Sequence, residues 1–126
     1  MQAKNILVVD DDVSNTDIVK LILESHGHRV SVSYSGKDAM QKVVQVRPDL
    51  AVLDVKMPDV DGYAVCKFIK GHPALSPVKV ILLTSQDLEK NVRNAEEAGA
   101  DAFLEKPCSV EKLIETVNRL LALRPA

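Results

Sequence analysis

Acidic, hydroxyl and basic side chains follow four short runs of residues that favour β-strands. They are Asp10, Asp11 and Asp12 after 5–9, Asp54 after 50–53, Thr84 and Ser85 after 78–83, and Lys106 after 102–105. Carboxylates brought within a few ångströms repel one another, and a hard divalent cation such as Mg²⁺ relieves that repulsion. The set contains no histidine or cysteine, which argues against zinc. A lysine and hydroxyl donors nearby could neutralise a phosphoryl group on or near Asp54.

Five predicted strands and five predicted helices would position these residues. The strands are expected over 5–10, 29–34, 50–54, 78–84 and 102–105. Helices are expected between them, beginning at the capping residues Asp12 or Ser14, Ser35, Asp61 and Ser109, and ending near Gly27, Gly71 and Gly99. In the first helix, the residues Ile18, Leu21, Ile22 and Ser25 share one face at helical spacing, which predicts the side that packs on the sheet.

Strict alternation of strands and helices predicts an α/β fold with a parallel sheet covered on both faces. We expect a flavodoxin-like, doubly wound (βα)5 arrangement with strand order 2-1-3-4-5. The run 29–34 alternates apolar and polar residues, as an edge strand does, whereas the run 78–84 is nearly all apolar and should be interior. Ligands of such sheets lie at the carboxyl ends of the strands. Any one of the polar residues could be an ordinary cap or turn residue, but their convergence at one edge predicts a functional site.

Length and composition place the chain among ordinary globular proteins. It has 126 residues, 46% hydrophobic and 27% charged, and we expect one domain over 1–126. The net charge is −2 and lysine and arginine are spread along the chain, so direct binding to nucleic acid is not expected. Cys66 and Cys108 lack metal-ligand spacing, and the first residues resemble neither a signal peptide nor a membrane span. A soluble cytoplasmic protein is predicted.

Four motifs, in order and in register, give the chain a close resemblance to the receiver domain of two-component response regulators, of the chemotaxis-regulator type. They are Val9-Asp10-Asp11, Leu53-Asp54-x-x-Met57-Pro58-x-x-Asp61-Gly62, Leu83-Thr84-Ser85 and Lys106-Pro107. The resemblance covers essentially the whole chain. It implies a phosphorylation switch in which Asp54 accepts a phosphoryl group from the phosphohistidine of a sensor histidine kinase or phosphotransfer protein.

The resemblance also implies roles for the residues around Asp54. Asp10, Asp11, Asp54 and the backbone carbonyl of Lys56 would hold Mg²⁺. Lys106, whose bond to Pro107 is commonly cis in the family, would pair with the phosphoryl oxygens. Lys56, Ser85 and Gln86 would lie beside the phosphoryl group. Lys56 and Gln86 would tune its lifetime, and Ser85 is small enough to leave it approachable.

The output implied by the resemblance is a change in one face of the molecule. Thr84 would move to hydrogen-bond the phosphoryl group, and Phe103 would turn inward behind it. The face made by the fourth helix, fifth strand and last helix would then bind a downstream partner, an output domain or a second copy of the chain. Such a protein is a signalling switch that catalyses only its own phosphorylation and dephosphorylation.

Three other functions fit parts of the sequence. Asp10-x-Asp12-Val13 superficially fits the nucleophile motif of haloacid-dehalogenase-type phosphatases, but only Glu111 and Glu115, both on a predicted helix, follow Lys106, and the chain lacks room for the usual cap. A degenerate receiver that only binds proteins is disfavoured by the intact acid cluster. A flavodoxin-like cofactor binder is disfavoured because no glycine-rich or hydroxyl-rich loop follows the first strand.

Overall fold

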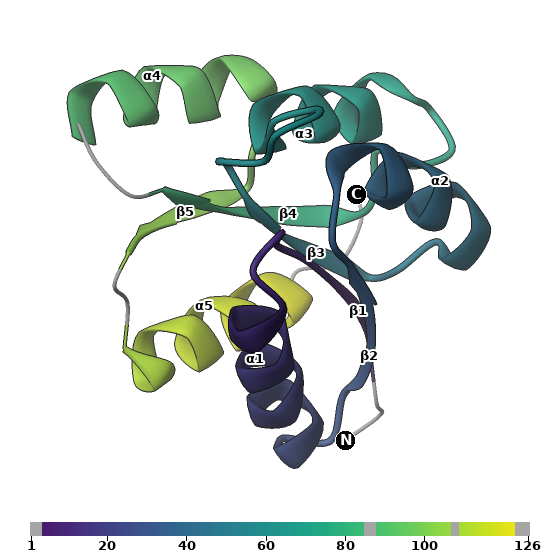
Figure 1. Ribbon diagram of the computed structural model, residues 1–126, viewed down its shortest axis with the longest axis vertical. Coiled ribbons are helices and arrows are strands. Elements are labelled where there is room, and N and C mark those ends of the chain that lie inside the picture. Colours follow the sequence, from purple (N-terminus) through teal and green to yellow (C-terminus); the bar gives the residue numbers. More distant parts are fainter. Residues whose placement is uncertain (1–3, 85–87, 107–108, 123–126) are drawn as a thin grey trace.

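A parallel sheet forms the centre of the molecule, and helices cover both of its faces (Figure 1). The computed structural model describes residues 4–84, 88–106 and 109–122. Within these ranges the strands are β1 (Asn5–Val9), β2 (Arg29–Ser33), β3 (Leu50–Asp54), β4 (Lys79–Thr84) and β5 (Ala102–Glu105). Their order is β2-β1-β3-β4-β5, which confirms the predicted order and the predicted edge position of β2.

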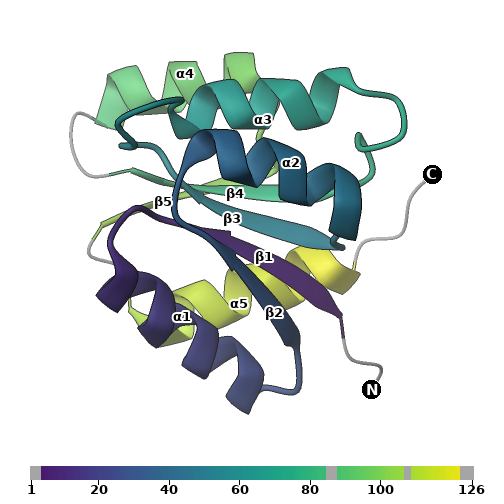
Figure 2. The ribbon, with the colours of Figure 1, turned by 45° about the vertical axis from the view of Figure 1, so that its right-hand side comes forward.

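The helices divide into two layers, one on each face of the sheet. They are α1 (Val13–Ser25), α2 (Gly36–Val46), α3 (Gly62–Gly71), α4 (Leu88–Ala98) and α5 (Val110–Ala122). Helices α1 and α5 lie on one face, and α2, α3 and α4 lie on the other, as the views in Figures 1 and 2 agree. None of the helices in the described ranges has both the length and the apolar character needed to cross a lipid bilayer.

Each layer has its own hydrophobic core, because side chains alternate between the two faces along a strand. In β1, Leu7 and Val9 pack in the cluster under α2, α3 and α4, whereas Ile6 and Val8 pack in the cluster under α1 and α5. The four residues of 50–53 are fully buried in the same alternating way. Burial on both faces explains why these strands appear in the sequence as continuous apolar runs.

The predicted helix caps are confirmed. Asp12, Ser35 and Asp61 are the N-cap residues of α1, α2 and α3, and each side chain accepts a hydrogen bond from a backbone N–H of the first turn. The hydroxyl of Ser109 accepts one from the N–H of Lys112 at the start of α5. Satisfying these otherwise unpaired donors fixes where each helix begins.

The predicted packing face of α1 is wrong. Ile18 and Leu21 are 57% and 70% exposed, whereas Thr16 and Leu23 are buried and Val19 packs on the core. Thr16 can be buried because its hydroxyl donates to backbone carbonyls one turn earlier, those of Asp12 and Val13. The helix carries two overlapping apolar stripes at helical spacing, and packing on the sheet selects the stripe that periodicity alone does not identify.

Candidate functional site

The carboxyl ends of four strands bring the predicted site residues to one edge of the sheet. The parallel register pairs Val9 with Leu53 and Asp54 with Leu83, so these strands end at nearly the same level. Asp10 directly follows β1, and Asp54 and Thr84 are the last residues of β3 and β4. Lys106 follows β5, and its N–H donates to the Thr84 carbonyl at 2.6 Å, which extends the pairing of β4 with β5 by one bond.

Three carboxylates meet at this edge. Asp10, Asp11 and Asp54 each offer an oxygen, and these oxygens all lie within 4.8 Å of one another. Asp10 and Asp54 are buried and Asp11 is exposed, so the cluster opens to solvent on one side. An all-oxygen donor set with one open side fits a hard cation such as Mg²⁺, which keeps several of its waters.

Asp12 lies beside this cluster but has a different task. Its Oδ1 accepts the Asn15 N–H at 3.1 Å as the cap of α1, and its own N–H donates to Asp10 Oδ1 at 3.0 Å. The second bond fixes the orientation of the Asp10 carboxylate. The triple aspartate therefore divides into two candidate metal ligands and one helix cap that orients the first ligand.

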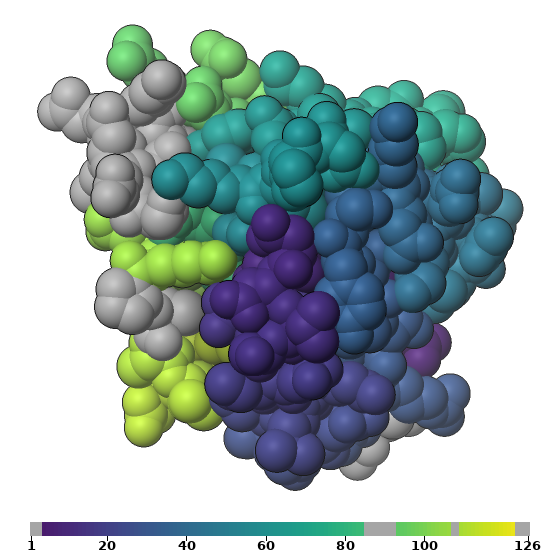
Figure 3. Space-filling model, viewed as in Figure 1, coloured from purple at the N-terminus to yellow at the C-terminus, as the bar shows by residue number. Residues whose placement is uncertain are grey.

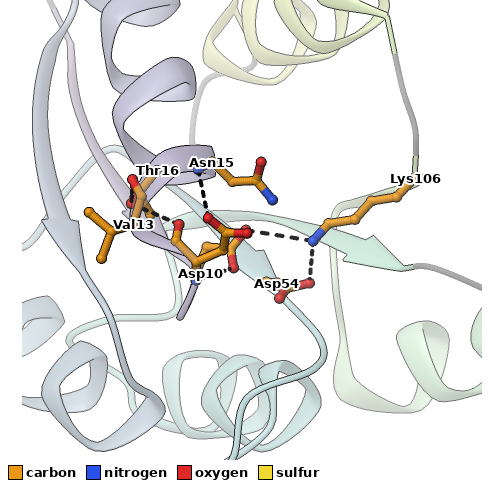
Figure 4. Close-up of polar contacts among 7 residues, drawn as sticks. Asp10, Val13, Asn15, Thr16, Asp54 and Lys106 are labelled. Atoms are coloured by element: carbon orange, nitrogen blue, oxygen red, sulfur yellow. Dashed lines mark hydrogen bonds and ion pairs between the residues drawn. The ribbon is translucent and has the colours of Figure 1, made fainter.

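Lys106 forms ion pairs with carboxylates at the ends of two strands, β1 and β3. Its ammonium lies 2.8 Å from Asp54 Oδ1 and 3.6 Å from Asp10 Oδ2, and its side chain is 28% exposed. Figure 4 shows the lysine extending from β5 toward both carboxylates. In Figure 3 the purple chain after β1, the teal loop after β3 and the yellow-green end of β5 meet on one face of the molecule. The site is thus accessible from outside.

Burial and the neighbouring charges shift the pKa values of this pair. Burial raises the pKa of Asp54, and the nearby Asp10 charge raises it further, against the opposing effect of Lys106. Burial would lower the pKa of Lys106, but its contacts with Asp54 and Asp10 outweigh burial and raise that pKa above its usual value. Lys106 is therefore a cation at neutral pH. The raised pKa of Asp54 means that ionising this carboxyl group destabilises the folded state.

Thr84 is buried, and its hydroxyl oxygen has no hydrogen-bond partner among the described residues. A hydroxyl removed from water without a partner is costly, so it is suited to gain a bond when an acceptor arrives. Phe103 is half-buried and packs against the core cluster under α2, α3 and α4. The Lys56 side chain is exposed. Ser85, Gln86 and Pro107 lie outside the described residues, so the predictions for them stay predictions.

One residue of the site region was not predicted. The Asp59 carboxylate, in the loop after β3, accepts hydrogen bonds from the backbone N–H groups of Gly36 and Lys37 at 3.1 and 3.0 Å. These partners lie 23 and 22 residues earlier in the chain. Sequence patterns report local caps, in which side chain and helix are adjacent, and offer no signal for a cap supplied from another element.

Comparison with known proteins adds evidence that is independent of this geometry. The family model of the response regulator receiver domain matches residues 6–118. The transcriptional regulatory protein ZraR of Salmonella typhimurium is 39% identical over 94% of this chain, which covers 26% of that protein. The chain also spans no more than about half the length of other transcriptional regulators that it matches.

Solved structures agree in fold. The receiver domain of a signal transduction histidine kinase from Syntrophus aciditrophicus superimposes with a TM-score of 0.90, is 39% identical, and is matched over 98% of this chain and 96% of that one. The receiver domain of the sensor histidine kinase PA1611 from Pseudomonas aeruginosa superimposes with a TM-score of 0.88 at 27% identity, over 97% of this chain and 100% of that one. That structure has a magnesium ion coordinated in its active site cleft.

Proposed function

The chain belongs to the response regulator receiver domain family of two-component signalling, and from that premise we propose that Asp54 is its phosphoryl acceptor. The main support for this proposal is the position of Asp54, which lies within the acid cluster and contacts Lys106. Phosphoryl transfer requires positive charge near the acceptor, which Lys106 supplies directly and the carboxylates would supply by binding a cation. Receivers of this family interact with histidine kinases or phosphotransfer proteins, so the donor is a phosphohistidine on such a partner.

Asp10, Asp11 and Asp54 would hold Mg²⁺, with the carbonyl of Lys56 as a further ligand. The mutual distances of the three carboxylate oxygens support this assignment, as does the magnesium in the related PA1611 receiver. When bound, the ion offsets the negative charge of the incoming phosphoryl oxygens and of the carboxylates themselves. The chain's own contribution is to hold the three carboxylates together, with Lys106 beside Asp54.

In the transfer, a carboxylate oxygen of Asp54 forms the new bond to phosphorus while the bond from phosphorus to the donor histidine nitrogen breaks. Lys106, already 2.8 Å from Asp54, pairs with the phosphoryl oxygens as they arrive. Hydrolysis of the acyl phosphate by water later restores Asp54. Lys56 and Gln86 tune the rate of this hydrolysis, and the small Ser85 leaves the phosphoryl group approachable. The protein thus catalyses only its own phosphorylation and dephosphorylation.

The phosphoryl group would be detected by Thr84 and Phe103. The Thr84 hydroxyl, which has no hydrogen-bond partner among the described residues, would gain an acceptor, and Phe103 would turn into the space behind it. Phe103 belongs to β5, and Thr84 ends the neighbouring strand β4. The surface of α4, β5 and α5 would therefore change and bind a downstream protein, an output domain or a second copy of the chain. In this assignment the domain acts in the cytoplasm, and any contact with DNA is made by another domain or protein.

The test is Mg²⁺-dependent phosphorylation by acetyl phosphate, followed by intact mass for the wild type, Asp54→Asn and Asp10→Asn. We expect a gain of one phosphoryl group in the wild type with Mg²⁺ and none in Asp54→Asn. A gain that persists in Asp54→Asn but is lost in Asp10→Asn would favour the phosphatase alternative. No gain in the wild type would favour a module that only binds proteins.

A further inference from the structure

The loop between β3 and α3, residues 55–61, is tied to the first turn of α2 by Asp59. Its Oδ1 accepts the Gly36 N–H at 3.1 Å, and its Oδ2 accepts the Lys37 N–H at 3.0 Å. The hydrogen bonds from Lys37 and other backbone N–H groups lower the pKa of Asp59 to about 2. The carboxylate is therefore ionised at neutral pH, where it also complements the positive end of the helix dipole.

Asp59 supplies what α2 cannot supply for itself. The first four N–H groups of a helix have no partner within the helix. The Ser35 hydroxyl accepts from Asp38, and the Ser35 carbonyl accepts from Ala39, but Gly36 and Lys37 are served by Asp59 alone among the described residues. Ser35 is thus a local cap, whereas Asp59 caps the same turn from a different part of the chain.

The loop is also in tight contact at both of its ends. A Cβ on Gly36 would lie 2.2 Å from the Val60 carbonyl oxygen, so the loop rests directly on the backbone of α2. A Cβ on Gly62 would lie 2.4 Å from the Asp54 carbonyl oxygen, and the Gly62 N–H donates to the Val55 carbonyl at 3.0 Å. Lys56 lies between these two anchored points, in the segment that leaves Asp54.

We propose that Asp59 is a positioning residue for the magnesium site, holding the loop that carries Lys56 in place against α2. This inference rests on the proposed function, because it assumes that Asp10, Asp11, Asp54 and the Lys56 carbonyl bind Mg²⁺. Asp59 is not one of these ligands, and its side chain accepts hydrogen bonds from the backbone N–H groups of Gly36 and Lys37. Mg²⁺ demands near-ideal octahedral geometry. If the loop moved and displaced the Lys56 carbonyl, Mg²⁺ would therefore bind more weakly even with all three carboxylates in place.

The experiment compares Asp59→Ala with Ser35→Ala by titrating Mg²⁺ into labelled protein and following backbone amide shifts. Ser35→Ala is the matched control, because it removes a cap from the same turn of α2 but leaves the tie to the loop. Both variants should melt at a lower temperature than the wild type. Only Asp59→Ala should weaken Mg²⁺ binding, by about tenfold, which is typical for loss of a residue that supports metal ligands.

A graded variant and a metal-free measurement complete the test. Asp59→Asn keeps one acceptor oxygen for one of the two N–H groups, so its Mg²⁺ dissociation constant should fall between those of the wild type and Asp59→Ala. Without Mg²⁺, the backbone N–H groups of residues 55–57 and 59–61 should exchange with solvent faster in Asp59→Ala than in Ser35→Ala, because only the former frees the loop.

The inference is overturned if Asp59→Ala melts like Ser35→Ala and binds Mg²⁺ within twofold of the wild type, since Asp59 would then be a cap and nothing more. It is equally overturned if Ser35→Ala weakens Mg²⁺ binding as much, because the effect would then belong to α2 as a whole. A wild type that does not bind Mg²⁺ refutes the proposed metal site itself and the inference with it.

Discussion

Lys106 Nζ lies 2.8 Å from Asp54 Oδ1 and 3.6 Å from Asp10 Oδ2, so one cation from β5 holds together carboxylates from β3 and β1. This arrangement places opposite charges beside each other at the carboxyl ends of the strands, where the site is partly exposed to solvent. The two carboxylates are buried and would repel each other without the lysine. The same arrangement is ready for a phosphoryl group, whose oxygens can take over the contact with Lys106.

Asp54→Asn should raise the melting temperature at pH 7. The pKa of Asp54 is raised in the folded state, so its protonation stabilises the fold below the unfolded-state pKa, near 3.8, and this contribution is lost as pH rises through the folded-state pKa. The variant has no carboxyl group to ionise at position 54, so it does not lose stability in this way as pH rises. Circular dichroism melts from pH 4 to 8 should show the difference shrinking toward pH 4. The control is Asp17→Asn, which changes an exposed carboxylate of α1. A melting temperature of Asp54→Asn below that of the wild type at pH 7 would contradict the prediction.

Lys106→Met should destabilise the protein at pH 7. The change keeps the apolar part of the side chain but leaves Asp54 and Asp10 without their cation. Loss of one partner of a fully buried pair costs several kcal/mol, and partial exposure of Lys106 reduces this to about 1–2 kcal/mol. Urea unfolding measures the loss, and Lys67→Met at an exposed lysine of α3 is the control. Added Mg²⁺ should restore part of the stability, and an unchanged unfolding midpoint without Mg²⁺ would refute the role of this contact.

Thr84→Val should leave phosphorylation of Asp54 intact but reduce the change that follows in α4, β5 and α5. Valine has a similar shape and lacks the hydroxyl that has no partner among the described residues, so stability should stay the same or increase slightly. Asp54 should still accept a phosphoryl group from acetyl phosphate. Amide shifts in α4, β5 and α5 on addition of beryllofluoride with Mg²⁺ should be smaller than in the wild type. Equal shifts in both proteins would exclude Thr84 as the sensor.

Asp11→Ala should mainly weaken Mg²⁺ binding and Asp12→Ala should mainly lower stability, although the two residues are adjacent. Asp11 belongs to the acid cluster, so its loss should weaken Mg²⁺ binding about tenfold or more with little effect on stability. Asp12 caps α1, so its loss should cost about 1 kcal/mol of stability. Calorimetric Mg²⁺ titration and urea unfolding measure the two effects. If Asp12→Ala weakened Mg²⁺ binding more than Asp11→Ala, the assignment of ligand and cap would be reversed.

Much of this structure could be predicted because the relevant forces act locally. The apolar run 50–53 and the break after Asp54 predict β3 with its observed bounds, and the capping residues Asp12, Ser35 and Asp61 predict three helix starts. Once the strands were recognised as parallel, their carboxyl ends had to share one edge. The meeting of Asp10, Asp11 and Asp54 follows from that topology.

Two features could not be predicted, for different physical reasons. The first is the packing face of α1, where Leu23 is buried and Leu21 is exposed. Both residues belong to apolar stripes, and the choice depends on how the helix lies on the edge of the sheet. The second is Asp59, which accepts hydrogen bonds from two amides of α2 that lie 23 and 22 positions earlier in the chain. Such a contact depends on the assembled fold rather than on any local pattern.

The most direct test of the central claim is to find the phosphoryl group itself. The protein is phosphorylated with acetyl phosphate and Mg²⁺, treated with borohydride, which reduces an aspartyl phosphate to homoserine, and mapped by peptide mass spectrometry. The account predicts homoserine in place of Asp54 and at no other aspartate. Homoserine in place of Asp10, or a phosphorylated protein with Asp54 intact, would contradict it.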